Sequence, residues 1–204
     1  MLYILELIGT MAFAISGVMA SLGRRPDWIG AMIMAFVTAI GGGVIRDAIL
    51  GQPSVAFRDP NIFYVTVVSA VIAISMSDKI ERIGRTLAVA DAVGLGLFNS
   101  AGLVMVLSSA DQPVPYPFAL VLGAVTGCGG GIVRDVLCAR MPVLLRPREI
   151  YISACLVGGA AGLTCFIGGS SNATVGIVTA VVTLLIRLLA IRFNWKLPAV
   201  KHVK

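Results

Sequence analysis

The segment Thr38-Ala-Ile-Gly-Gly-Gly-Val-Ile-Arg-Asp47 occurs twice in this chain in nearly the same form. The second copy, Thr126-Gly-Cys-Gly-Gly-Gly-Ile-Val-Arg-Asp135, begins 88 residues further on and keeps the threonine, the three glycines and the Arg-Asp pair. Each copy lies inside a long apolar stretch. A motif repeated at this spacing indicates two related units, and the fold expected for the chain follows from them.

The composition is that of a membrane protein. Of 204 residues, 58% are apolar and 13% are charged, and the mean hydropathy is +0.96. Soluble domains carry roughly 25% charged residues. We therefore predict an all-α membrane protein with seven transmembrane helices, each near the roughly 20 residues needed to cross a bilayer. The expected spans are 2–22, 27–50, 62–77, 86–109, 117–139, 150–169 and 172–192.

The first span is interpreted as a permanent helix, since no basic residue precedes it and Arg24-Arg25 follow it, unlike a signal peptide. The basic residues then predict the orientation by the positive-inside rule. Twelve of them fall in one set of alternate loops and in the C-terminal tail, whereas the opposite loops hold only Arg58. We expect a bacterial or archaeal inner-membrane protein with its N-terminus outside and its C-terminus in the cytoplasm.

Each repeat unit contains three spans, so the second unit enters the membrane from the opposite face. The sequence thus predicts two inverted three-helix repeats, residues 1–85 and 86–170, followed by a seventh helix and basic tail, residues 171–204. Upstream of the glycines, the small-residue run Ala14-Ile-Ser-Gly17 is aligned with Asp91-Ala-Val-Gly94.

Three adjacent glycines cost a helix roughly 1 kcal/mol each relative to alanine. A break of this kind is tolerated in a bilayer where the freed backbone groups find partners in protein or in a water-filled cavity. One hypothesis is that Gly41–Gly43 and Gly129–Gly131 kink helices two and five near the midplane, and that unwound carbonyls replace a cation's hydration shell. The hydroxyls of Thr38 and Thr126 would add ligands. The alternative is close helix packing through small residues.

Charged residues at membrane depth usually face a cavity or a partner. Because helix neighbours point about 100° apart, we expect Arg46 and Asp47 not to pair with each other. The alternative for both motif arginines is to extend to the headgroups, as is expected of Arg187, and Glu6 is expected at the interface. Asp91 is expected either to line a cytoplasmic vestibule or to bind a basic loop residue, Lys79 or Arg85. The candidate residues of an ion path are Thr38, Gly41, Gly42, Gly43, Arg46, Asp47, Asp91, Thr126, Gly129, Gly130, Gly131, Arg134 and Asp135.

Other function classes find no support in the sequence. There is no P-loop, no Ser–His pair and no Cys-x-x-Cys spacing, and the one histidine, His202, lies in the tail. The four cysteines are interpreted as small core residues. The basic residues lack the aromatic interleaving typical of nucleic-acid binding. We expect neither an enzyme nor a cofactor, metal or nucleic-acid site.

These motifs, together with Phe13-Ala-Ile-Ser-Gly17 and Asp91-Ala-Val-Gly-Leu95, resemble a bacterial family of paired three-helix domains. That family is labelled putative glycine transporter, or UPF0126, and is similar to the trimeric intracellular cation (TRIC) channels. The resemblance covers nearly all of residues 1–170. It implies a homotrimer, one hydrophilic pore in each protomer along helices two and five, and permeation by monovalent cations, mainly K⁺. The Lys-Glu-Val motif linked to phosphoinositide binding in animal members is missing, so that property is not carried over.

Three functions remain open at this stage. The first is a K⁺-permeable channel. The second is a secondary transporter of a small amino acid such as glycine, because inverted repeats and broken helices suit a carrier equally well. The third, a structural scaffold, leaves the charges within the membrane unexplained.

Overall fold

A computed structural model describes residues 2–77, 83–108, 114–147 and 149–198. Over this part of the chain it has seven α-helices, and each falls within a few residues of an expected span. Their bounds are α1 Leu2–Ser21, α2 Trp28–Ile49, α3 Pro60–Met76, α4 Ile83–Leu107, α5 Tyr116–Leu137, α6 Ile152–Ile167 and α7 Asn172–Phe193. Five are long and apolar enough to cross a membrane, whereas α3 and α6 are shorter.

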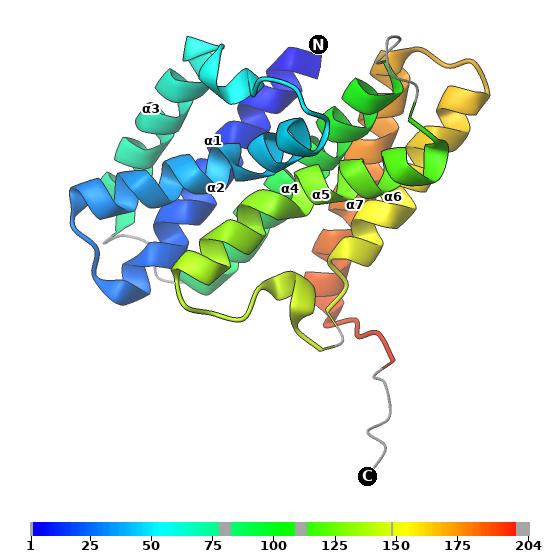
Figure 1. The fold of residues 1–204 in the computed structure, drawn as a ribbon. Helices are drawn as coiled ribbons and strands as arrows, with labels where there is room; N and C mark the ends of the chain where they lie inside the picture. The colour runs from blue at the N-terminus through cyan, green and yellow to red at the C-terminus, as the bar shows by residue number, and fades with distance from the viewer. Residues whose placement is uncertain (1, 78–82, 109–113, 148, 199–204) are drawn as a thin grey trace.

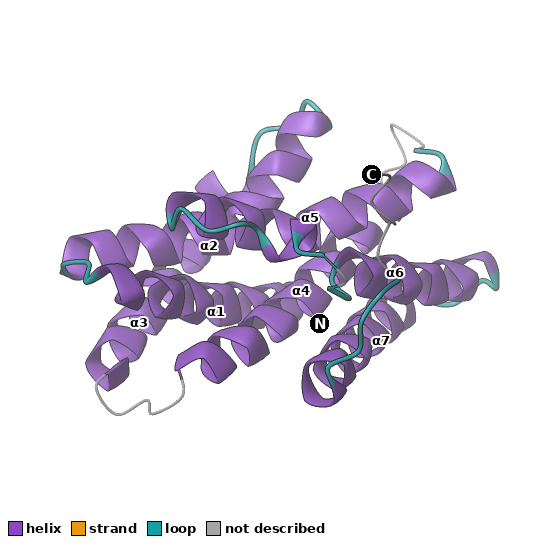
Figure 2. Ribbon diagram, turned by 90° about the horizontal axis from the view of Figure 1, so that it is seen from below, coloured by secondary structure: helices purple, strands orange, loops and turns teal. Residues whose placement is uncertain are grey.

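The helices pack as two groups joined at the centre. Helices α1, α2 and α3 contact one another, and α4, α5 and α6 form the second group, with α7 packed on α4 and α6. The groups meet where α1 lies against α4 and where α2 crosses α5 (Figures 1 and 2). In Figure 1, α1 begins at the top of the bundle and α7 ends at the bottom. The candidate residues therefore lie at the junction of the two groups.

Short polar side chains set the helix starts. The carboxylate of Asp27 accepts a hydrogen bond from the Gly30 amide at 2.7 Å, and that of Asp59 accepts one from the Asn61 amide at 2.9 Å. The Ser171 hydroxyl caps α7 in the same way through the Thr174 amide. These bonds satisfy amides that the first helical turn leaves free. Each of these three helices begins within two residues of its expected span.

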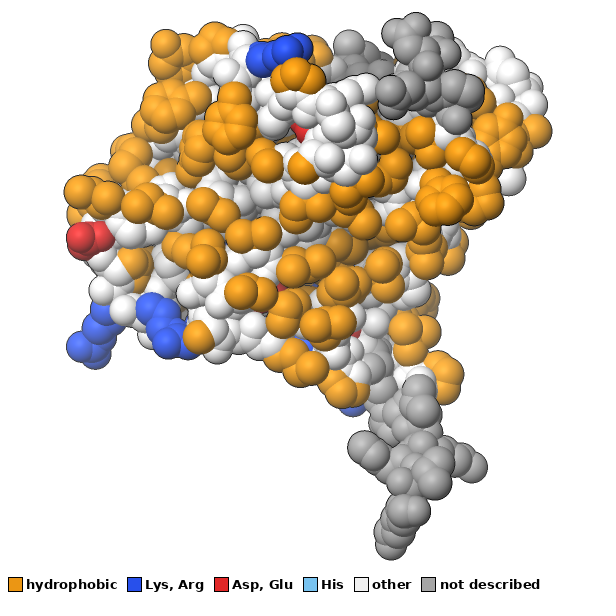
Figure 3. Space-filling view, in the orientation of Figure 1, with side chains coloured by type: hydrophobic (Ala, Val, Ile, Leu, Met, Phe, Trp, Pro, Cys, Tyr) orange, Lys and Arg blue, Asp and Glu red, His pale blue; other side chains and the backbone are white. Residues whose placement is uncertain are grey.

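Large apolar side chains face outward, in the reverse of a soluble protein. Ile29 is 69% exposed, Phe118 63% and Val68 58%, whereas the buried core is rich in alanine, glycine and serine. Figure 3 shows a broad apolar band, with the basic side chains gathered near its upper and lower edges. An exposed apolar belt of this extent requires lipid as its solvent. The protein is an all-α membrane protein.

The two copies of the motif end their helices in the same way. After α2 the chain turns through Gly51 in a left-handed conformation (φ 65°), and after α5 it turns through Ala139, also left-handed (φ 46°). The amide that follows each turn donates to the aspartate carbonyl of its own motif, Gln52 to Asp47 and Arg140 to Asp135, both at 2.9 Å. The turn is thus a feature of the repeat.

We expect Gly51→Ala to destabilise the protein by about 1 kcal/mol, since a Cβ is unfavourable in the left-handed region. Nothing lies within 4 Å of the added Cβ, so crowding does not contribute. Gly84→Ala, equally uncrowded but without a positive φ, is the matched control and should leave the protein unchanged or slightly more stable. Thermal unfolding in detergent measures both, and equal effects of the two substitutions would contradict this account of the turn.

Candidate functional site

The motif glycines form the contact between α2 and α5. A Cβ on Gly42 would collide with the carbonyl oxygen of Thr126, and a Cβ on Gly130 would collide with the carbonyl oxygen of Thr38. The contact is reciprocal, because each glycine of one copy meets the threonine of the other copy. The two helices approach at backbone contact, which only residues without side chains permit.

The expected unwinding at the glycines is wrong. Both α2 and α5 run as continuous α-helices through Gly41–Gly43 and Gly129–Gly131. Their carbonyls therefore stay in the helical hydrogen-bond ladder and do not replace a hydration shell. Close packing, the alternative drawn from the sequence, accounts for Gly42 and Gly130. A bend within the continuous helices stays a prediction.

The threonines of the motif are fully buried. Their hydroxyls donate one turn back within their own helices, Thr38 to the Met34 carbonyl at 2.6 Å and Thr126 to the Leu122 carbonyl at 2.7 Å. They pack close to Gly17 of α1 and Gly102 of α4, respectively. Each hydroxyl proton is used in a hydrogen bond within its own helix. In this conformation the two threonines therefore support the helix crossing.

Between the two groups, Phe13 of α1 stacks on Phe98 of α4, with ring centroids 5.2 Å apart. Gly94 makes room for the ring of Phe13, and Gly9 lies against that of Phe98. These reciprocal contacts pair Gly9 with Gly94, so the alignment of Gly17 with Gly94 is wrong. Gly17, which packs on Thr38, corresponds to Gly102, which packs on Thr126. In this register Glu6 corresponds to Asp91.

A charged cluster is buried at the end of α5; it comprises Ser16, Asp91, Arg134, Asp135 and Tyr151 and is called here the Arg134 cluster. The Arg134 guanidinium lies 2.6 Å from the Asp91 carboxylate and 2.9 Å from that of Asp135. It also donates to the Ser16 hydroxyl, and the Tyr151 hydroxyl donates to Asp91 at 3.2 Å. One guanidinium thus connects α5 with α1 and α4.

The end of α2 carries the corresponding group, Glu6, Arg46 and Asp47, called here the Arg46 cluster. Arg46 pairs with Asp47 at 2.7 Å, and the other carboxylate oxygen of Asp47 accepts the Val55 amide at 3.1 Å. The second copy repeats this last bond between Asp135 and the Val143 amide at 3.0 Å. Glu6 lines a small cavity with Arg46 and Asp47. Over the described residues, Glu6 and Arg46 form no hydrogen bond or ion pair with each other. The α2 end therefore lacks the cross-link between helices that Arg134 makes at the α5 end.

Larger cavities open beside the two clusters. One of about 310 Å³ is lined by Asp91, Arg134 and Asp135, and basic residues surround it, including Arg140 and Arg146. Another of about 310 Å³ lies at the other end of the bundle, where Tyr3, Glu6, Arg46 and Ser108 line it. The stacked phenylalanines and the glycine crossing lie between the two ends. In this conformation the space between the cavities is packed.

Several charge predictions need correction. The arginine and aspartate of each motif do pair, because the long guanidinium side chain turns back to the neighbouring carboxylate despite the 100° between their Cα–Cβ directions. The arginines do not extend to the headgroups either, since Arg46 is 2% and Arg134 1% exposed. Asp91 lines a cavity, as one expectation had it, but its partner is Arg134 and not Arg85. Lys79 lies outside the described residues.

The sequence did not identify three members of this region as site residues, although it named Arg187 as a residue near the headgroups. Arg187 is buried; it donates to the Ile150 carbonyl at 2.8 Å, pairs with Glu149 at 3.0 Å, and lies over the Tyr151 ring. It therefore does not extend to the headgroups. Ser16 joins the Arg134 cluster from α1, and Tyr151 joins it from the position just before α6. The sequence indicated these two residues only by their positions. Ser16 lies within the Phe13–Gly17 motif, and Tyr151 follows Arg146-Pro147.

The arrangement defines a class: a seven-helix membrane protein whose two three-helix groups bury a charged cluster at either end of a glycine crossing. Solved structures of the same arrangement are TRIC channels. A TRIC trimeric intracellular cation channel orthologue from Rhodobacter sphaeroides matches with a TM-score of 0.88 and 29% identity, covering 95% of this chain and 98% of the other. A further TRIC cation channel matches with a TM-score of 0.84 and 28% identity, covering 98% of both chains.

Sequence comparison supplies the family. The model of the glycine transporter family matches residues 3–78 and 88–167. The UPF0126 inner membrane protein YadS of Escherichia coli K12 is 39% identical, covering 97% of this chain and 95% of the relative. A UPF0126 membrane protein of Vibrio cholerae is 38% identical, covering 97% and 82%. The chain belongs to this UPF0126, or glycine transporter, family.

We expect Arg134→Met to destabilise the protein by about 3–5 kcal/mol, because it leaves two carboxylates buried without a counter-charge. Arg140→Met removes the same charge from an exposed position of the same cavity, and it should change stability by no more than about 0.5 kcal/mol. Thermal or denaturant unfolding of the purified protein in detergent distinguishes them. Similar losses for both variants would mean that the cluster does not stabilise the fold.

Proposed function

We propose that the chain is a channel for monovalent cations, mainly K⁺, with the path inside each protomer between α1, α2, α4 and α5. The observation that carries this proposal is the formal charge of the two clusters. Each cluster contains one arginine and two carboxyl groups, Arg134 with Asp91 and Asp135, and Arg46 with Glu6 and Asp47, so carboxyl groups outnumber the arginine in both. An excess of buried carboxyl groups within a cluster favours cations over anions, although further basic residues line the cavity beside Asp91. The likeness to the TRIC cation channels points the same way.

The proposed path has the symmetry of an inverted repeat. The reciprocal contacts Gly42 to Thr126 and Gly130 to Thr38 support two units related by a two-fold axis. With the axis in the membrane plane, residues 1–85 and 86–170 enter from opposite faces, and residues 171–204 add the seventh helix and the tail. The two clusters then lie at opposite mouths of one path.

In this account the described conformation is closed. The Phe13–Phe98 stack and the helix crossing fill the centre, and Arg134 connects three helices at one mouth. Opening then requires α2 and α5 to separate or bend near Gly43 and Gly131, the motif glycines beside the charged clusters. The remaining candidates, Thr38, Gly41, Thr126 and Gly129, lie at the crossing that moves.

The setting follows from the relatives and from the basic residues. The Escherichia coli relative is described as an inner membrane protein, and we assign this chain the same membrane. The positive-inside rule places its N-terminus outside and its C-terminus in the cytoplasm. A homotrimer with one pore in each protomer is proposed from the likeness to the trimeric channels.

A second candidate is a secondary transporter of a small amino acid such as glycine. Two cavities separated by a packed centre are what alternating access requires. Each has a volume of about 310 Å³, and each has both acidic and basic side chains in its lining, which suits a zwitterion. The name of the family to which the chain belongs, glycine transporter, also points to this substrate. A carrier differs from a channel in that its two ends never open together.

Recording from purified protein in planar bilayers separates the two. A channel gives discrete unitary currents whose reversal potential in a KCl gradient lies near that of K⁺. A glycine carrier gives saturable uptake into proteoliposomes and no unitary currents. The second result would replace the channel proposal.

Glu6→Gln should weaken cation selectivity, because it removes the charge that makes the Arg46 cluster negative. The expected result is a reversal potential shifted towards zero in a KCl gradient. Asp27→Asn makes the same charge change at an exposed helix cap, where asparagine caps equally well, and it should leave selectivity unchanged. Selectivity that is the same in both variants would remove the assigned role of this cluster.

The motif glycines offer a further test. A Cβ on Gly43 meets only the Arg46 guanidinium at 3.9 Å and enters the small cavity of the Arg46 cluster, whereas a Cβ on Gly42 collides with backbone. We therefore expect Gly43→Ala to fold normally but to conduct less, and Gly42→Ala to lose thermal stability. Unfolding curves and single-channel currents measured on both variants check this. Full conductance in Gly43→Ala would place the path elsewhere.

A further inference from the structure

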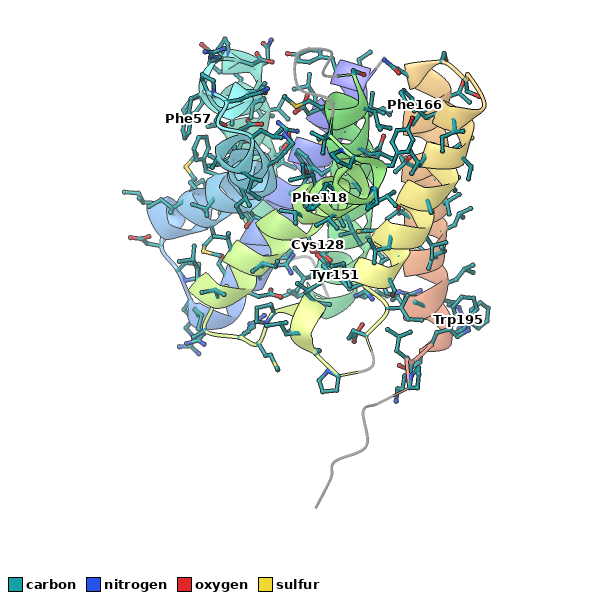
Figure 4. The ribbon with its side chains drawn as sticks, turned by 45° about the vertical axis from the view of Figure 1, so that its right-hand side comes forward. Phe57, Phe118, Cys128, Tyr151, Phe166 and Trp195 are labelled. Atoms are coloured by element: carbon teal, nitrogen blue, oxygen red, sulfur yellow. The ribbon has the colours of Figure 1, made fainter. Side chains whose placement is uncertain are left out.

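Two buried thiols face each other beside the Arg134 cluster. Cys128 immediately precedes the second glycine run on α5, and Cys155 lies one turn into α6; their sulfur atoms are 3.9 Å apart. Both side chains are almost completely buried, at 1% and 0% exposure, in an apolar group that also contains Tyr151. Figure 4 shows Cys128 and Tyr151 close together at the junction of α5 and α6. The proposed ion path uses neither thiol.

The sulfur–sulfur distance favours a shared metal ion over a disulfide. A disulfide needs the sulfurs at about 2.05 Å, so they would have to approach by nearly 2 Å in a packed interior. Two metal–sulfur bonds of about 2.3 Å place the sulfurs about 3.8 Å apart at a tetrahedral angle and about 4.6 Å apart in a line. The observed 3.9 Å lies within that interval. A linear two-coordinate ion therefore requires the sulfur atoms to move apart by about 0.7 Å, less than half of the approach that a disulfide requires.

The surroundings restrict the ion. No group of three His, Cys, Asp or Glu side chains able to hold a metal occurs among the described residues, so the tetrahedral set that zinc prefers is not formed there. Soft thiolates select soft cations, and burial disfavours a site with net charge. A divalent ion of low coordination number bound by two thiolates is neutral. Two S–H bonds break, two metal–sulfur bonds form, and both protons leave to water without any change of oxidation state.

We propose that Cys128 and Cys155 form a two-coordinate site for a soft, thiophilic cation, of which Hg²⁺ gives the neutral complex. The ion reaches the thiols past Tyr151, whose hydroxyl donates to Asp91, a residue that lines the cavity beside the Arg134 cluster. Once bound, it ties α5 to α6. It then holds Tyr151, four residues before Cys155, against Asp91, and on the proposed channel function it stops conduction.

The binding test uses the full chain with Cys138→Ala and Cys165→Ala, which leaves only the paired thiols. With Hg²⁺ and an excess of a competing monothiol, this protein should retain one Hg²⁺ per chain, counted by intact-protein mass spectrometry. Adding either Cys128→Ser or Cys155→Ser should abolish retention, because one remaining thiolate loses to the competitor. Size-exclusion elution shows which variants are folded, and either serine variant alone decides the question. No retention by the paired-thiol protein, or retention by a folded serine variant, would overturn the site.

The conduction test is separate from the binding test. Hg²⁺ should abolish the cation current of the paired-thiol protein, and the current of the serine variants should persist. A protein that binds one Hg²⁺ but never conducts keeps the metal site and refutes the channel. Undiminished current with Hg²⁺ bound would refute the block.

Discussion

Helices α2 and α5 touch through their backbones at Gly42 and Gly130, and most of the molecule is arranged around that contact. Because each glycine meets the threonine carbonyl of the other copy, the crossing fixes how the two three-helix groups lie against each other. It also fixes where the two helix ends point, and therefore where Arg46 and Arg134 are buried. A methyl group at the crossing would push apart elements that carry both charged clusters.

The buried charges make this fold energetically costly. Ionised groups at membrane depth are unfavourable unless each finds a partner. The chain meets this requirement in the same way in both copies of the motif. The arginine pairs with the aspartate next to it, and that aspartate also accepts a hydrogen bond from a backbone amide after the helix, at Val55 and at Val143. The Arg134 cluster adds Asp91, Ser16 and Tyr151, so the two ends share a design but differ in how firmly they are cross-linked.

That difference bears on how the molecule moves. At the α5 end one guanidinium holds three helices together, and Arg187 supports Tyr151 from α7. At the α2 end the charges stay on their own helix and Glu6 stands apart. On the proposed channel function, opening of the two ends would depend on different contacts, although the two motif copies end their helices in the same way. The thiol pair of Cys128 and Cys155, packed with Tyr151, is found only at the α5 end, which is the more strongly cross-linked of the two.

The sequence by itself determined the helical spans, because lipid imposes a length and an apolar composition that can be read along the chain, and it showed the motif twice. It named the motif arginines and aspartates as site residues but not their partners. Asp91 and Arg134 are 43 residues apart, and helical periodicity gives the face of a residue without saying what packs on it. Only the tertiary structure decided that the glycines join two continuous helices and that neighbouring Arg46 and Asp47 pair. Both outcomes depend on how closely separate helices approach, and that distance is set by side chains far apart in the sequence.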